Sequence, residues 1–225
     1  MKSTVRWGIL GTGRIAKAYA EGLKNTRNGK LMAIASRNRE SAELFAQEWE
    51  VENAFCSYEE LAKSPLIDAV YVATPHTEHA KNAILCMEKG KAVLCEKPIA
   101  VNAQEVTKMI GAAKENNVLF MEGMWSRFPP LMDEVRRMIA ENEIGEIRTI
   151  HADFGFRPEV KEPNSRLFNP NLAGGSLLDV GIYPISLSFM INGSPSSFIS
   201  DWTVGETGVD EQASIIFKYK NGSMA

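Results

Sequence analysis

The sequence lacks the features that would direct a chain to nucleic acid, to a membrane or out of the cell. It has 225 residues with 25 Lys and Arg against 28 Asp and Glu, a formal net charge of −3, so it offers no basic field for nucleic acid. No apolar run approaches transmembrane length, and the polar start Met1-Lys-Ser-Thr lacks the apolar core of a signal peptide. These absences predict a cytoplasmic protein with neither nucleic acid nor membrane as a partner.

Cysteine is scarce as well. Cys56, Cys86 and Cys95 are an odd number without paired spacing, and each lies in or beside an apolar segment. This pattern predicts buried thiols in a reducing compartment and argues against a disulfide framework. With 44% hydrophobic and 24% charged residues, the chain can bury a sizeable core, and its length suggests two domains.

A glycine-rich turn near the beginning indicates phosphate binding. An apolar strand from Val5 runs into Gly11-x-Gly13-x-x-Ala16, and a helical pattern follows to about Leu23. Gly11 permits a tight turn, Gly13 lets the backbone approach a pyrophosphate, and Ala16 allows close helix–sheet packing. A second strand, Leu31–Ala35, completes the βαβ unit; the alternative is a glycine turn that is only structural. The predicted cofactor contacts here are Gly11, Thr12, Gly13, Arg14 and Ile15.

The end of the second strand bears on which cofactor is bound. An acidic residue there would accept the ribose hydroxyls of NAD, but this chain has Ser36-Arg37-Asn38-Arg39. A hydroxyl followed by a guanidinium can bind a 2′-phosphate through charge-assisted hydrogen bonds. Ser36 and Arg37 therefore favour NADP, with NAD still possible. Alternatively, Arg37 or Arg39 only solvates the start of a helix.

Two further strand ends carry polar residues. Ala92-Val-Leu-Cys-Glu-Lys-Pro98 is a short apolar strand that delivers Glu96 and Lys97 to the carboxyl edge of the sheet, where open α/β sheets bind ligands. Both residues are predicted cofactor contacts. The bland alternative for Lys97 is a solvated strand-end charge. Ala69–Ala73 is another strand of the buried type, and the residues after it are predicted to line the cofactor: Thr74, Pro75, His76 and His79.

The two neighbouring histidines raise the question of a metal. His76 and His79 are close in sequence, but no clustered cysteine or acidic residue completes a zinc site, and His151 is remote. The sequence therefore predicts no metal, and the two histidines are expected to line the cofactor or to start a helix.

A second glycine turn, Gly174-Gly175, leads into an apolar helix. Asp179 and Tyr183 are four residues apart there, so both side chains are expected on one helical face, where they can point into one cleft. Pro184 removes one helical hydrogen bond and should bend the segment. The alternative is a buried tyrosine and a capping aspartate in a packing helix.

The order of predicted elements gives the fold class. Strands and helices alternate from Val5 to about Glu122, the pattern of a doubly wound parallel sheet, and the pattern changes near Gly123. A helix from about Pro130 to Ala140, a long strand around 147–156 and an irregular loop at 157–171 follow. We predict an α/β dinucleotide-binding domain at 1–122 and an α+β domain with an open, largely antiparallel sheet at 123–225.

The last residues predict an unfinished sheet. Ala213–Tyr219 has the pattern of a strand and Asn221-Gly222 that of a hairpin turn, but the chain stops at Ala225 before a return strand. The second domain is therefore expected to be truncated, with an open edge.

Three of these segments together resemble the Gfo/Idh/MocA oxidoreductase family, which has the Rossmann dinucleotide turn, a Glu-Lys-Pro signature and a glycine-led helix. The closer resemblance is to the branch of dimeric dihydrodiol dehydrogenase and NADP-dependent D-xylose 1-dehydrogenase, through Ala73–His79, Met121–Phe128 and Asp179–Tyr183. Many relatives in the wider family have histidine where this chain has Tyr183, so the tyrosine points to this branch.

The resemblance implies an activity and roles for particular residues. Tyr183 would be the general acid/base, with Lys97 favouring its ionised form and also contacting the cofactor ribose, and Asp179 would complete the site. The reaction would oxidise a sugar or cyclic diol hydroxyl with transfer of a hydride to the nicotinamide. The second domain would bind substrate and form a homodimer in the full-length protein.

Aromatic and basic residues are candidates for substrate contacts. Trp125 and Phe154 could wall the cleft, although aromatic residues are as often part of a core. Arg157 could touch a polar substrate, as could Arg127 and Arg166, but surface solvation is the alternative for each. Two other functions remain open at this point: a dinucleotide-binding regulator without catalysis, since fold alone does not fix function, or an inactive truncated fragment of the enzyme.

Overall fold

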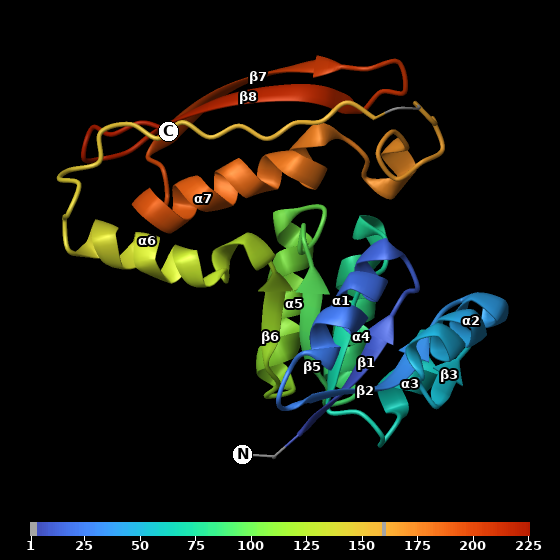
Figure 1. Cartoon of the computed structure of the whole chain (residues 1–225). Helices are drawn as coiled ribbons and strands as arrows, with labels where there is room; N and C mark the ends of the chain where they lie inside the picture. Colours follow the sequence, from blue (N-terminus) through green and yellow to red (C-terminus); the bar gives the residue numbers. More distant parts are fainter. Residues whose placement is uncertain (1–3, 159–160) are drawn as a thin grey trace. The chain divides into compact units, whose positions relative to one another are not determined.

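The computed structural model describes residues 4–158 and 161–225 and divides into two compact units, Met1–Gly123 and Met124–Ala225 (Figure 1). The sequence places the corresponding boundary between Glu122 and Gly123. Each unit has secondary structure of its own kind. The first is an α/β unit built on a parallel sheet, and the second combines helices with a small antiparallel sheet.

The first unit contains a six-stranded parallel sheet in the order β3-β2-β1-β4-β5-β6, as the alternating pattern predicts. Its strands are β1 (Val5–Leu10), β2 (Gly29–Ala35), β3 (Asn53–Phe55), β4 (Ala69–Val72), β5 (Ala92–Glu96) and β6 (Phe120–Gly123). Its helices are α1 (Arg14–Lys24), α2 (Arg39–Trp49), α3 (Tyr58–Lys63), the 3₁₀ turn η1 (His76–Glu78), α4 (His79–Glu88) and α5 (Ala103–Glu115).

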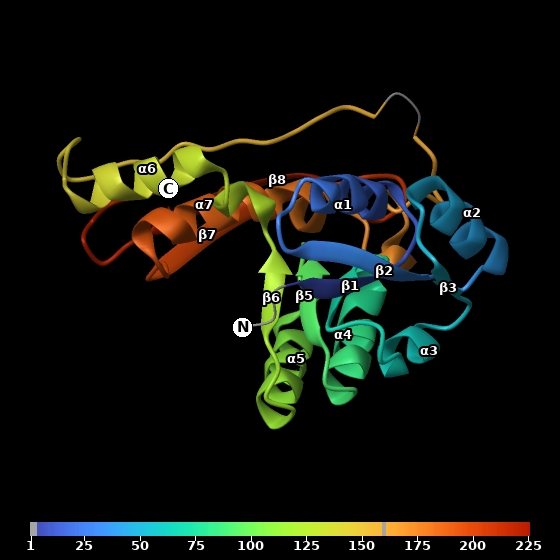
Figure 2. The same cartoon turned by 60° about the horizontal axis from the view of Figure 1, so that its bottom comes forward.

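Helices cover both faces of this sheet. Figure 2 shows α1 and α2 on one face and α3, α4 and α5 on the other. Because side chains alternate along a strand, each central strand contributes side chains to the cores on both faces of the sheet. In β1, Ile9 packs toward α1 and α2 while Leu10 packs toward the opposite layer, and in β4 Tyr71 and Val70 divide in the same way. The sheet is thus buried on both sides, and its carboxyl edge carries the loops that can meet a ligand.

The strand order reverses between β1 and β4, and the backbone is crowded at that point. Ala73 donates its N–H to the Leu10 carbonyl at 2.9 Å. Gly11, the next residue after Leu10, has a φ of +101°, and a Cβ placed there would lie 2.6 Å from the Ala73 carbonyl oxygen. Only glycine fits this position without strain, since L side chains rarely adopt such a φ. Gly13 differs, because a Cβ there would meet no atom within 4 Å.

The second unit is built around one helical stretch and a strand pair. Its helices are η2 (Trp125–Arg127), α6 (Pro130–Ala140), η3 (Pro170–Leu172), the π-helix η4 (Leu177–Gly181) and α7 (Ile182–Asn192), and its strands are β7 (Ser197–Val204) and β8 (Asp210–Lys218). The helix expected at Pro130–Ala140 is confirmed with those bounds. The π-helix directly precedes α7, so the irregularity expected around Pro184 lies on its N-terminal side.

β7 and β8 pair antiparallel, and the chain turns back after β8 as expected. Gly222 takes a φ of +82° in that turn, and Phe217 exchanges backbone hydrogen bonds of 2.8 and 3.1 Å with Ala225. Met224 also forms an isolated antiparallel bridge with Lys218, and no further strand follows β8 among the described residues, as the sequence predicted.

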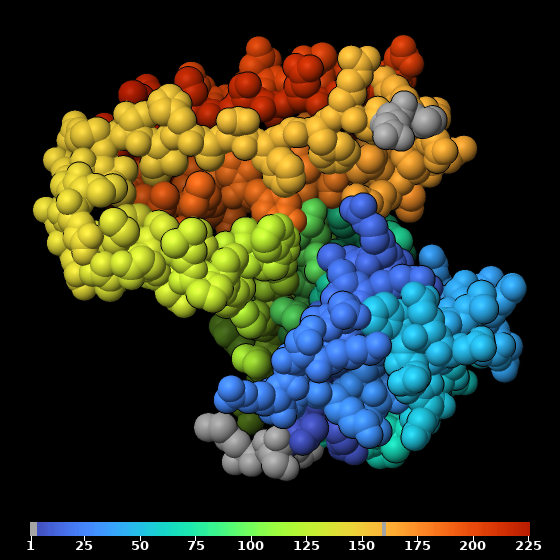
Figure 3. All heavy atoms as spheres, in the orientation of Figure 1, coloured from blue at the N-terminus to red at the C-terminus, as the bar shows by residue number. Residues whose placement is uncertain are grey.

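The long strand expected around 147–156 is wrong. This segment is extended, but its described strand-like pairing is an isolated parallel bridge between Thr149 and Met224. Figure 3 shows it as a yellow to light-orange band on the surface of the second unit. Extended backbone becomes a strand only where a partner supplies a ladder of hydrogen bonds, and here the described residues supply one isolated bridge. The irregular loop expected at 157–171 has neither helix nor strand among its described residues before Pro170. Glu159 and Val160 lie outside the described residues.

The expectation that no apolar stretch reaches transmembrane length is also wrong. The helical stretch Pro170–Asn192 has 23 residues and a hydropathy of 1.3, long and apolar enough by length and composition to cross a membrane. This is weak evidence for a span, because the core helix of a soluble protein passes the same test. The stretch also carries Asp179, whose carboxylate is buried and ion-paired within the same unit.

The two glycines of the first turn should respond differently to a methyl group. Gly11→Ala should lower the free energy of unfolding by about 1–3 kcal/mol, because it imposes the strained φ and a clash with Ala73. Gly13→Ala is the matched control and should leave stability within about 0.5 kcal/mol, since its backbone is ordinary and the space is open. Urea unfolding of both variants measures the difference, and equal losses would contradict the crowding at Gly11.

Candidate functional site

The turn between β1 and α1 presents an open backbone surface. Gly13, Arg14 and Ile15 are exposed and Thr12 is half-buried, while Ala16, on the inner side of α1, has no exposed surface. Gly13 is the N-cap of α1, and no side chain caps it. The backbone N–H groups of this helix start can therefore meet an anion, as a dinucleotide pyrophosphate requires. The residues present fit a dinucleotide.

Ser36 and Arg37 follow the carboxyl end of β2. Ser36 is buried and its Oγ accepts the N–H of Asn38 at 3.2 Å, so its hydroxyl helps to shape the turn before α2. Arg37 is exposed, and its guanidinium lies near the Tyr58 hydroxyl. Burial raises the pKa of Tyr58, and the neighbouring Arg37 opposes that rise. Arg39 instead pairs with Glu43 at 3.7 Å along α2, which leaves Arg37 as the better candidate to meet a phosphate.

The loop after β4 is fixed by two buried side chains of α4. Asn82 donates through Nδ2 to the Thr74 hydroxyl at 3.1 Å, and His79 Nε2 lies 2.8 Å from the Thr74 carbonyl oxygen. His79 has no exposed surface, and its Nδ1 lies 2.8 Å from the Pro98 carbonyl oxygen. Its ring therefore has both nitrogens engaged inside the protein, a position that favours a structural contact over the predicted cofactor contact. His76, Thr74 and Pro75 stay at the carboxyl edge, half-buried or buried.

Burial lowers the pKa of His79, and the nearby Lys97 acts in the same direction. The carbonyls of Pro98 and Thr74 oppose this, because they favour the protonated ring, but burial is the larger effect. The neutral ring has one N–H, so it donates to one of the two carbonyls at a time.

Lys97 lies in a turn at the end of β5 whose backbone is held by carboxylates. The Lys97 N–H donates to Glu96 Oε2 at 3.1 Å, and the Ile99 N–H donates to Glu122 Oε1 at 3.0 Å. Lys97 itself is half-buried. Glu96, predicted as a cofactor contact, thus serves first as an acceptor for the turn that carries Lys97.

Glu96 also connects to a buried aromatic pair. The Tyr71 hydroxyl donates to Glu96 Oε1, and the Tyr71 ring stacks on Tyr19 of α1 with ring centroids 3.9 Å apart. Burial raises the pKa of Glu96, while its hydrogen bonds with Tyr71 and Lys97 oppose that rise. The same burial raises the pKa of Tyr71, so this phenol stays protonated and remains a donor.

In the second unit, Tyr183 lies between the two predicted aromatic walls. The indole N–H of Trp125 donates to the Tyr183 hydroxyl oxygen at 2.9 Å, and the Phe154 ring centroid is 5.3 Å from that of Tyr183. Trp125 is 60% exposed and Phe154 50% exposed, so neither is a core residue. The structure thus brings together the predicted acid/base and two predicted substrate contacts. Arg157 is exposed further along the same segment, and no contact described by the structure joins it to Tyr183.

Asp179 lies in the π-helix before α7. It is 6% exposed, and its Oδ1 accepts from Arg166 Nη1 at 2.8 Å. Surface solvation was one alternative for Arg166, but the guanidinium instead supplies a cation to a buried carboxylate. An acidic group kept charged at this depth needs such a partner.

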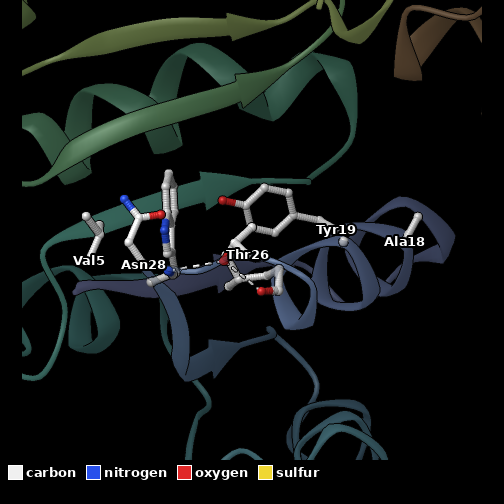
Figure 4. A pocket seen from close by; sticks show the side chains of 9 residues that line it. Val5, Ala18, Tyr19, Thr26 and Asn28 are labelled. Atoms are coloured by element: carbon white, nitrogen blue, oxygen red, sulfur yellow. Dashed lines mark hydrogen bonds between the residues drawn. The ribbon is translucent and has the colours of Figure 1, made fainter. Parts of the chain in front are cut away.

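Two cavities are lined in part by residues named above. One of about 410 Å³ lies between α1 and the starts of β1 and β2, where Figure 4 shows Val5, Tyr19 and Asn28 around it. It lies at the strand starts, away from the carboxyl edge, so it is not the predicted dinucleotide site. The other, about 280 Å³, is in the second unit and is lined by Phe154 together with Pro184 of α7 and Phe217 of β8.

Among the described residues, no group of three or more His, Cys, Asp or Glu side chains could hold a metal ion. Cys86 and Cys95 are buried and Cys56 is half-buried, all as free thiols. Burial raises the pKa of Cys86 to about 12 and raises that of Cys95 as well, which makes both poor nucleophiles near neutral pH.

Sequence reasoning did not find the supporting residues of the site. Tyr71 has no motif of its own, Glu122 lies in the Met121–Phe128 segment without a predicted role, and Arg166 is one arginine in an irregular loop. The available signal was weak: Tyr71 is the only aromatic residue in an otherwise aliphatic strand, and Glu122 is an acidic residue at the end of a strand.

Two family models match the chain. One, described as an oxidoreductase family with an NAD-binding Rossmann fold, matches residues 5–124, and the GFO/IDH/MocA C-terminal domain matches residues 132–225. A trans-1,2-dihydrobenzene-1,2-diol dehydrogenase from Mus musculus is 40% identical over 222 residues, covering 97% of this chain and 66% of that protein. The protein of the same name from Xenopus laevis is 40% identical over 224 residues, covering 98% and 67%. The chain thus spans about two thirds of the length of these relatives.

Solved structures of oxidoreductases are also similar to this chain. KijD10, a 3-ketoreductase from Actinomadura kijaniata in complex with NADP and TDP-benzene, aligns with a TM-score of 0.90 and 28% identity over 99% of this chain and 68% of that one. An NAD binding oxidoreductase from Klebsiella pneumoniae aligns with a TM-score of 0.86 and 25% identity over 98% and 65%.

The buried His79 should make stability depend on pH. Because the pKa of His79 is lowered in the folded chain, the unfolded chain binds the proton more readily. The free energy of unfolding should therefore fall as the pH drops below about 6.5, the pKa of an unperturbed histidine. His79→Gln removes that titration, so the gap in melting temperature between the wild type and the variant should narrow from pH 7.5 to pH 5. The same substitution at the exposed His151 is the control. A gap at His79 that stays constant with pH would contradict the burial effect.

Proposed function

Because the chain belongs to the Gfo/Idh/MocA oxidoreductase family, we propose that the protein transfers a hydride between NADP and the hydroxyl carbon of a sugar or cyclic diol. The observation that carries the proposal is the grouping of Tyr183 with Trp125 and Phe154. A phenol flanked by exposed aromatic rings is suited to a substrate with a polar and an apolar side. The relatives named as diol dehydrogenases and as a 3-ketoreductase support the same class of reaction.

The cofactor part of the proposal rests on the first unit. The open backbone at Gly13 and the exposed start of α1 fit a pyrophosphate, and Arg37 fits a 2′-phosphate. NADP is therefore preferred, with NAD possible. Accepting the hydride is the chemistry that the cofactor supplies when bound.

The protein's own residues would move the proton. In this proposal Tyr183 takes the proton of the substrate hydroxyl as the hydride leaves, and it returns a proton in the reverse direction. Lys97 favours the ionised phenol, because a cation within a few ångströms stabilises phenolate. The indole N–H of Trp125 donates to the Tyr183 oxygen and so orients the hydroxyl. Asp179, ion-paired with Arg166, completes the proposed site.

We further propose that the protein resides in the cytoplasm and that the full-length chain forms a homodimer, with a small molecule as its partner and neither nucleic acid nor membrane. The three free thiols support a reducing compartment. The exposed apolar residues of β7, among them Phe198 and Trp202, support burial of this sheet in an assembly.

Loss of the Tyr183 hydroxyl should abolish turnover. Tyr183→Phe should lower kcat by about 100- to 10,000-fold, the range for removal of a general acid/base, while the NADPH dissociation constant stays within about twofold. The initial rate of NADPH formation with NADP and a panel of D-xylose, D-glucose and a cyclic trans-diol measures the first value, and NADPH fluorescence titration the second.

Tyr219→Phe is the matched control for that experiment, because Tyr219 is a buried tyrosine of the same unit outside the grouping. It should keep the wild-type rate. Turnover that survives in Tyr183→Phe would refute the acid/base role, and NADPH binding by a wild type that turns over none of the panel would favour a dinucleotide-binding regulator.

Cofactor preference should depend on Arg37. Arg37→Ala should weaken NADP binding by about 10- to 100-fold, the value of one lost charge-assisted hydrogen bond, and should change NAD binding little. Arg39→Ala is the control, since Arg39 pairs with Glu43 on α2. Calorimetric titration with each cofactor measures both variants. Equal losses for NADP and NAD in Arg37→Ala would mean that Arg37 does not read the 2′-phosphate.

A further inference from the structure

The turn that carries Lys97 is held by three acidic or aromatic side chains that each meet a different backbone group. Glu96 Oε2 accepts the Lys97 N–H at 3.1 Å, and Glu122 Oε1 accepts the Ile99 N–H at 3.0 Å. The Pro98 carbonyl between them lies 2.8 Å from His79 Nδ1. The three side chains come from β5, β6 and α4, so three separate elements fix one turn.

His79 differs from the two carboxylates because it also reaches a second loop. Its Nε2 lies 2.8 Å from the Thr74 carbonyl oxygen, in the loop after β4. A rigid ring with polar atoms on two edges therefore spans the loops that follow two neighbouring strands, β4 and β5. The ring has no exposed surface, so water does not compete for either contact.

From this geometry we propose that His79 is a positioning residue, which fixes the Glu96–Lys97–Pro98 turn against the loop after β4 and thereby sets the place of Lys97. The effect on catalysis rests on the proposed function, in which Lys97 acts on Tyr183. The effect on Lys97 itself does not depend on that function, since it follows from contacts within the first unit.

A purely structural role for His79 predicts different results for its variants. If the ring only filled the core, an aromatic ring of similar size would serve, and any loss of activity would follow the loss of stability. If it positions Lys97, the contact through Nδ1 to Pro98 should matter more than the contact through Nε2 to Thr74.

Two substitutions separate the contacts. In His79→Asn the side-chain amide occupies the place of Nδ1 and can donate to the Pro98 carbonyl, whereas in His79→Gln the longer amide reaches the place of Nε2 and Thr74. His79→Phe retains the bulk and loses both. Asn82→Leu is the matched control, because Asn82 is buried on the same helix and holds the same Thr74 loop through the hydroxyl.

The first measurement is of Lys97 directly. In the full chain with ¹³C-dimethylated lysines, the Lys97 resonance is assigned by its disappearance in Lys97→Arg. We expect this resonance to shift or broaden in His79→Phe and in His79→Gln, and to remain near its wild-type position in His79→Asn and in Asn82→Leu. A Lys97 resonance that is unmoved in His79→Phe overturns the inference, whatever the protein's activity.

The second measurement is of turnover. With the substrate found in the panel, kcat should fall by about 10- to 100-fold in His79→Phe and His79→Gln, the cost of misplacing a catalytic group by about 1 Å, with KM within about threefold. His79→Asn should recover most of kcat. Values of kcat that instead follow the melting temperatures of all four variants, Asn82→Leu included, would overturn the inference.

Lys97→Met separates the two levels of the argument. If Lys97→Met keeps the wild-type rate, the proposed role of Lys97 in catalysis is wrong. In that case the resonance experiment alone tests whether His79 positions Lys97. If Lys97→Met loses the rate and His79→Phe keeps it, the positioning fails while the proposed function stands.

Discussion

The close approach of two backbones at the centre of the parallel sheet governs the rest of the first unit. The chain leaves β1 at Gly11. A Cβ at this position would lie only 2.6 Å from the carbonyl oxygen of Ala73, which follows the end of β4. That crowding forces a glycine with positive φ, turns the chain sharply into α1, and leaves the start of the helix exposed. The same residue pair marks the point where the strand order reverses, which is where open α/β sheets bind their ligands.

Contacts continue from this point across the sheet edge. Thr74 follows Ala73 directly, its carbonyl meets His79, and the other side of the His79 ring meets Pro98 beside Lys97. Short contacts at the ends of β1, β4 and β5 therefore run from the glycine turn after β1 to the turn that carries Lys97. Such contacts are worth more inside a protein than at its surface, because no water competes for them. These contacts fix the backbone of the turn from which the Lys97 side chain extends.

The sequence predicted those parts of the fold that depend on local pattern. The parallel sheet follows from apolar strands that alternate with amphipathic helices, and the family follows from motifs whose members are close together in the chain. The strand expected around 147–156 failed because its partner, Met224, is far away in sequence and supplies one isolated bridge. Pattern measures the tendency of a segment to extend, but pairing depends on what the rest of the chain brings beside it.

The candidate site shows the same division. Lys97 and Tyr183 lie in recognisable motifs, and their roles stay predictions. The motifs do not show which groups the supporting residues contact. The burial of His79 depends on the packing of α4 against the sheet, and the pairing of Arg166 with Asp179 depends on how a long irregular loop folds back. Both are consequences of tertiary structure, so no local reading of the sequence could assign them.

The two units hold their functional groups by different physical means, and this bears on which part of the site can vary. The turn that carries Lys97 is held by hydrogen bonds from side chains to its backbone groups. Almost any substitution of these side chains leaves a buried polar atom unsatisfied, at a cost of about 1–3 kcal/mol. Tyr183 is flanked instead by Trp125 and Phe154, whose rings are largely exposed and can be exchanged with little loss of stability. The turn that carries Lys97 is therefore the more constrained of the two groups, and the aromatic rings beside Tyr183 are the more open to substitution.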